Sequence, residues 1–161
     1  MKHILSMSIA LGVILLSAPS AHSEQAKTTL WFGPPQIVTE ATRMVEGDQV
    51  DEGMDLLSQA LEMDLGPHNR AMVYTNLCMG HVRKQEYAQA LELCERALGI
   101  RPGQWQAINN RGCAHHGLGN LDQAVRDFTR ASILNPDNED IVLNLTMAMQ
   151  DRNRLRPSTE E

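Results

Sequence analysis

The sequence predicts an all-α fold of about three helix pairs followed by one capping helix. The chain has 161 residues, which suits one domain or a short repeat array. Two observations predict helical repeats. Aromatic residues make up only 4% of the chain, which favours close-packed helices over a β-sandwich. The chain also repeats itself at a spacing of 34 residues, a period typical of helix–turn–helix arrays. The repeated identities pair Asn76 with Asn110, His81 with His115, Gln89 with Gln123, Ala90 with Ala124, Arg96 with Arg130, Ala97 with Ala131 and Pro102 with Pro136.

Residues 1–23 have the pattern of an export signal. Lys2 supplies the positive start, residues 4–16 are almost entirely apolar, and Ala21 and Ser23 are small residues that suit a signal peptidase. We expect cleavage after Ser23, with a cut after Ser20 as the rival. The apolar run is shorter than the ~20 residues that span a bilayer. The sequence therefore predicts a periplasmic or secreted protein with no membrane insertion after cleavage.

The rest of the chain divides into helix pairs. Residues 24–33 form a linker, and 34–70 a degenerate first repeat. Residues 71–104 and 105–138 are the two clear repeats. In the last pair the helices are predicted at 105–117 and 121–134, because Gly119 and Asn120 indicate a turn between them and Pro136 stops the second helix. Residues 139–153 follow as a capping helix, with Asp137 or Asn138 as its cap, and 154–161 as a frayed tail.

Residues 71–138 resemble tetratricopeptide repeats. The residues that carry this resemblance are Tyr74, Leu77, Ala90, Ala97, Pro102, Gly112, Gly119, Ala124, Phe128, Ala131 and Pro136. The resemblance implies a right-handed solenoid whose first helices line a concave wall. It also implies a scaffold that binds a protein or an extended peptide, with no enzyme activity and no cofactor. The sequence departs from the family at Cys78, where Gly or Ala is usual, and at His81 and His115, where Tyr is usual.

Three asparagines, Asn76, Asn110 and Asn144, occupy the same place in successive first helices. Their amides could bind the backbone of an extended peptide, or they could hydrogen-bond the neighbouring helix, and the sequence leaves both readings open. The other residues expected to face the ligand are Met72, Met79, Gln106, Asn109, Cys113, His116 and Met147. Since this wall lacks a cluster of Lys and Arg, we do not expect it to clamp the carboxylate tail of a chaperone.

The three cysteines raise further possibilities. Cys78 and Cys94 should face each other across one helix pair, so we expect a disulfide, with two buried free thiols as the alternative. Cys113 and His116 share a helix face, which suggests an alternative role in thiol or metal handling. Two ligands are too few for a closed metal site, so no metal is predicted.

Other function classes fit the sequence poorly. The net charge of −6 argues against a nucleic-acid partner. No nucleophile–base motif or phosphate loop is present, so an enzyme is not expected. A third possibility is a structural subunit of an envelope complex.

Overall fold

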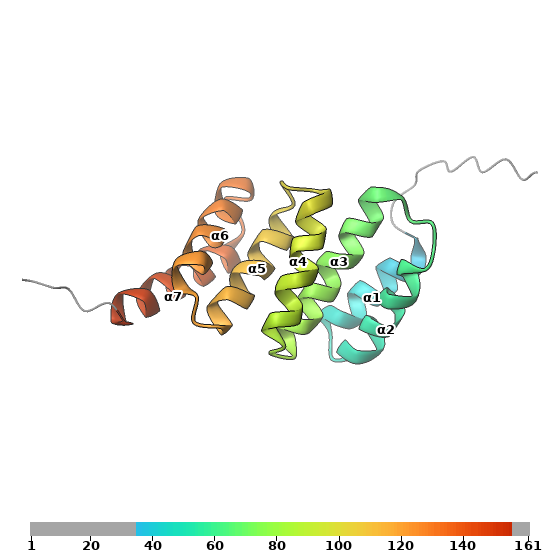
Figure 1. Ribbon diagram of the computed structural model, residues 1–161, viewed down its shortest axis with the longest axis horizontal. Helices are drawn as coiled ribbons and strands as arrows, with labels where there is room; N and C mark the ends of the chain where they lie inside the picture. Colours follow the sequence, from blue (N-terminus) through green and yellow to red (C-terminus); the bar gives the residue numbers. More distant parts are fainter. Residues whose placement is uncertain (1–34, 156–161) are drawn as a thin grey trace, which may run out of the picture. The chain divides into compact units, whose positions relative to one another are not determined.

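The structure, a computed structural model, describes residues 35–155. The predicted signal peptide, the linker and the tail from residue 156 onward lie outside the described residues. Within them the chain forms seven helices and no strand, which confirms the all-α prediction (Figure 1). The helices are α1 Gln36–Glu46, α2 Val50–Leu61, α3 Gly66–Arg83, α4 Tyr87–Ile100, α5 Trp105–Gly117, α6 Leu121–Leu134 and α7 Glu139–Leu155. None of these seven is both long and apolar enough to cross a membrane.

The helices pack as three successive pairs, α1 with α2, α3 with α4 and α5 with α6. The first helices of the pairs, α1, α3 and α5, also contact one another in order, and α7 continues this row (Figure 1). Helix α7 packs on α6 and α5 but has no second helix of its own in the described part of the chain. This is the predicted arrangement of three pairs and a capping helix.

Two helix ends lie away from the predicted boundaries. Helix α3 begins at Gly66, inside the segment assigned to the first repeat, where Gly66 takes a φ of 65° and Pro67 fits the first turn. Helix α7 begins as predicted, with the Asn138 side chain accepting a 3.0 Å hydrogen bond from the Ile141 N–H. It ends at Leu155, so the first two residues of the predicted tail are helical.

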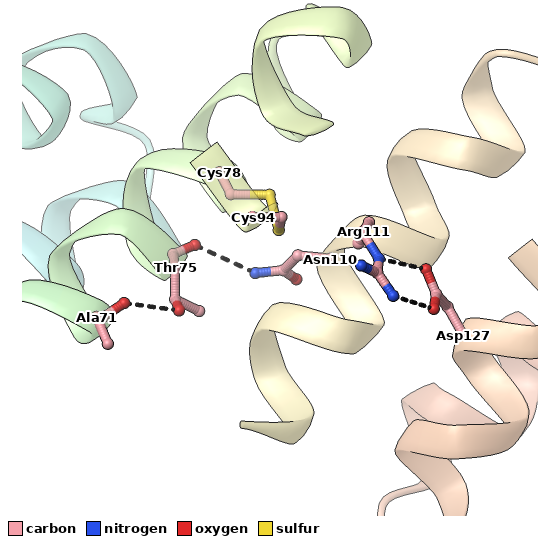
Figure 2. The surroundings of a disulfide bond; sticks show 7 residues. All are labelled: Ala71, Thr75, Cys78, Cys94, Asn110, Arg111 and Asp127. Carbon is pink, nitrogen blue, oxygen red and sulfur yellow. Dashed lines mark hydrogen bonds and ion pairs between the residues drawn. A yellow bond between two sulfur atoms is a disulfide. The ribbon is translucent and has the colours of Figure 1, made fainter. Parts of the chain in front are cut away.

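A disulfide joins α3 to α4 in the second pair (Figure 2). It links Cys78 and Cys94, whose Cα atoms are 5.4 Å apart and whose side chains are fully buried. The residues 34 positions later are Gly112 and Phe128. A Cβ atom on Gly112 would lie 2.7 Å from the Phe128 ring, so this glycine lets α5 approach α6 closely. The same place in two successive pairs is therefore filled first by a covalent bond and then by an aromatic ring.

A second repeated position is filled by an ion pair that the sequence analysis did not predict. Arg111 of α5 donates two hydrogen bonds, of 2.8 and 2.7 Å, to the Asp127 carboxylate of α6 (Figure 2). Asp127 holds the pKa of this guanidinium above its usual value. In the preceding pair the corresponding residues are Leu77 and Leu93, which pack in one apolar cluster. At this repeated position the α5–α6 pair therefore has a bidentate ion pair, whereas the α3–α4 pair has two leucines in an apolar cluster.

Candidate functional site

The row of first helices is hollowed by a groove of about 650 Å³. Six of the ten residues predicted to face a ligand line it. They are Met72, Asn76 and Met79 from α3, and Gln106, Asn109 and Asn110 from α5. These six residues therefore converge on one open space.

The other four predicted residues line a separate recess of about 200 Å³. They are Cys113 and His116 from α5, and Asn144 and Met147 from α7. The side-chain N–H₂ group of Asn144 lies 3.2 Å from the Asn109 oxygen and 3.8 Å from the Cys113 sulfur. Since Asn109 lines the groove and Cys113 lines the recess, Asn144 lies between the two hollows. The single wall expected from the sequence is thus divided in two.

Each of the three asparagines donates to the preceding first helix. Asn110 donates to the backbone oxygen of Thr75 in α3 at 3.4 Å (Figure 2). Asn76 donates to the Thr42 hydroxyl of α1, and Asn144 donates to α5 as described above. The packing role that the sequence left open is therefore present in the structure.

The packing contacts leave hydrogen-bonding groups available on the two asparagine amides in the groove. A side-chain amide has two N–H donors and one acceptor oxygen. One donation each leaves Asn76 and Asn110 with a second N–H and a carbonyl oxygen, and both residues line the groove. A role in ligand binding stays a prediction.

The groove also contains residues that the sequence analysis missed. Arg101 and Gln104 come from the segment between α4 and α5, and Trp105 begins α5. Loop residues have no helical period, so the repeat pattern could not place them. Gln104 is only 7% exposed, and its side-chain oxygen is buried without a hydrogen-bond partner among the described residues. Glu46 and Asp140 add two carboxylates to the lining.

The recess contains the free cysteine. Burial raises the pKa of the Cys113 thiol to about 11, so the group is protonated at neutral pH. His116 faces Asp151 with its Nε2 atom 2.9 Å from the carboxylate. Within residues 35–155, no three His, Cys, Asp or Glu side chains are grouped so that they could hold a metal ion.

Comparison with known proteins finds a family of helical repeats to which the repeat segment is similar. Residues 77–149 match the family model of the tetratricopeptide repeat. The chain is 26% identical to protein unc-45 homolog B of Xenopus tropicalis over 105 residues, which are 65% of this chain and 11% of that protein. It thus spans about a tenth of the length of this relative.

Two solved structures share the fold. The first repeat domain of human RPAP3 superposes with a TM-score of 0.67 at 22% identity, covering 76% of this chain and 94% of that one. The corresponding domain of Spaghetti, bound to the HSP90 peptide SRMEEVD, gives a TM-score of 0.64 at 23% identity and covers 71% of this chain and 91% of that one.

Proposed function

We propose that this chain, whose residues 77–149 match the family model of the tetratricopeptide repeat, is an exported scaffold, without catalytic activity, that binds an extended segment of a partner protein in the groove. The observation that carries the proposal is the position of Asn76 and Asn110. Both line the groove and both keep one donor and one acceptor after bonding the neighbouring helix. An extended peptide presents backbone N–H and C=O groups that such amides can pair with, whatever its side chains.

The charges of the groove disfavour an acidic ligand. Arg101 and His68 are accompanied by two carboxylates, Glu46 and Asp140, so the lining offers no excess of positive charge for an acidic peptide. Met72 and Met79 supply flexible apolar contact. The proposed ligand is therefore a neutral extended segment, in contrast to the acidic peptide SRMEEVD held by the Spaghetti domain.

A peptide array tests the choice of ligand. The full-length protein is incubated with immobilised extended peptides of neutral and of acidic composition, with SRMEEVD as the acidic comparator. We expect binding to neutral peptides and little to SRMEEVD. A preference for SRMEEVD would contradict the charge argument, and failure to bind any peptide would contradict the groove as a binding site.

The role of Asn110 is tested on the best-binding peptide. One lost hydrogen bond costs about 1 kcal/mol, so Asn110→Ala should weaken binding about fivefold. The matched control is Asn153→Ala, since Asn153 is an exposed asparagine of α7 that lines neither hollow. Unchanged affinity together with a lower urea midpoint for Asn110→Ala would assign this residue to packing alone.

Export to the periplasm or the extracellular space is part of the same proposal. The signal pattern of residues 1–23 supports it, and so does the disulfide, because such bonds persist in oxidising compartments. N-terminal sequencing of protein purified from its own host should find Glu24 or a neighbouring residue at the mature terminus. An intact Met1 would contradict export with cleavage.

Two alternatives remain from other function classes. Thiol or metal handling would use Cys113 and His116, which do share the recess with Met147. The raised pKa of Cys113 weighs against it, because the thiolate is the nucleophile and the metal ligand. A structural subunit of an envelope complex would show no affinity for isolated peptides but would co-purify with one fixed large partner.

A further inference from the structure

Helix α7 carries an apolar face that the described part of the chain covers only in part. Val142 and Met149, two turns apart on one side of the helix, are 49% and 40% exposed. Leu145 lies between them and is half-buried. Thr146, a small exposed residue, completes the face. We call these four residues, Val142, Leu145, Thr146 and Met149, the α7 face.

The repeat shows what covers this face in an earlier unit. The residues 34 positions before Val142 and Thr146 are Ile108 and Gly112 of α5. Ile108 is fully buried, and Gly112 lies directly against the Phe128 ring of α6. On α5, therefore, the corresponding face packs against the second helix of its own pair. The α7 face is therefore the side on which a first helix packs against the second helix of its pair, and α7 has no second helix in the described part of the chain.

We propose that a second copy of this chain supplies that helix, with the two α7 helices packed antiparallel around a two-fold axis. Such an interface is self-complementary, because the same patch serves both subunits. The two-fold axis would pass near Thr146, whose small side chain permits close approach. Val142 of each copy then lies opposite Met149 of the other.

The charges at the ends of α7 determine the direction of pairing. Glu139 in the first turn and Arg152 in the last turn each lie one turn beyond the α7 face, whereas Arg154 is already paired with Asp151 of the same helix. Antiparallel packing brings the acidic start of one helix beside the basic end of the other, whereas parallel packing would place like charges together. The pairing also leaves the groove open, because its lining residue Asp140 lies on a different side of α7 from Val142 and Met149.

Sedimentation equilibrium of the full-length protein tests the proposal. We expect a reversible dimer over a range of about 1–100 μM protein, with association weakened by added salt. Val142→Lys and Met149→Lys should each raise the dimer dissociation constant at least tenfold, because each would bury a charge at the centre of the interface. Both side chains are substantially exposed within one subunit, so neither change disturbs its core.

The matched control is Leu143→Lys. Leu143 is 58% exposed on the same helix, but it lies outside the α7 face, so this variant should remain dimeric. The Cys113→Ser variant should also remain dimeric, which separates the proposed contact from a disulfide between copies. The proposal is overturned if the parent protein is monomeric at about 100 μM. It is equally overturned if Leu143→Lys dissociates the dimer as strongly as Val142→Lys, or if Cys113→Ser abolishes it.

Discussion

Reducing the disulfide of the second helix pair should destabilise the protein strongly. Cys78 and Cys94 are separated by 16 residues, and closing a loop of that length in the unfolded chain lowers its entropy by an amount worth about 3 kcal/mol at 25 °C. Small domains are typically stable by about 5–15 kcal/mol, so the cross-link supplies a large part of the total. Reduction keeps both sulfur atoms in place, which makes it a cleaner perturbation than deleting either side chain.

Urea unfolding with and without reductant measures this effect. Because both cysteines are fully buried, the protein is reduced while unfolded and then refolded in the reductant. The midpoint should fall by roughly 1–3 M urea for a slope of about 1–3 kcal/mol per M. The double variant Cys78→Ala/Cys94→Ala should not respond to reductant, whereas Cys113→Ser should respond as the parent protein does.

Two results would refute this reasoning. Alkylation of the unreduced, denatured protein should modify one cysteine, and modification of all three would show that the bond is absent. An unchanged midpoint after complete reduction would show that the cross-link leaves the entropy of the unfolded chain almost unaffected.

Three other perturbations address individual contacts. Gly112→Ala forces a Cβ atom against the buried Phe128 ring and should lower the free energy of unfolding in urea by about 1–3 kcal/mol. The control is Gly99→Ala, whose new Cβ atom meets no atom within 4 Å and which should be neutral or slightly stabilising. Equal effects of the two substitutions would contradict the contact. Asp127→Ala leaves the Arg111 guanidinium without its partner. Because the Arg111 side chain is only 23% exposed, we expect the free energy of unfolding to fall by about 2–3 kcal/mol. A fall below about 1 kcal/mol would contradict the role of the ion pair. Alkylation of Cys113 in the folded protein should accelerate about tenfold per pH unit from pH 7 towards its pKa of about 11, and a plateau near pH 8 would contradict that pKa.

The fold was predictable where several sequence signals coincide. The sequence predicts helices at 105–117 and 121–134, and α5 and α6 have those bounds. There the 34-residue repeat, the Gly-Asn turn and Pro136 all indicate the same ends. The start of α3 at Gly66 differs from the repeat boundary, because neither a strong cap nor a repeated residue marks it in the sequence.

The site was less predictable, because it depends on contacts between side chains. Helical periodicity assigned the groove residues of α3 and α5 to one face, and the structure brings them together. It could not show that Asn144 contacts both Asn109 and Cys113 and so separates two hollows. Asp127 was missed for a related reason. A carboxylate on a helix is usually solvated, and only its partner Arg111 on the neighbouring helix reveals that it is buried.

The asparagine bonds give the stack a polarity. Asn76, Asn110 and Asn144 all donate towards the N-terminal side, so each unit depends on the one before it for an acceptor. Deleting α1 would leave the amide of Asn76 without its partner. Deleting α7 would strand no asparagine donor: it would return the Asn109 oxygen to water and uncover the apolar surface of α5 and α6 that Ile141 and Ala148 cover. As far as these hydrogen bonds are concerned, losing a unit at the N-terminal end strands a donor, whereas losing one at the C-terminal end does not.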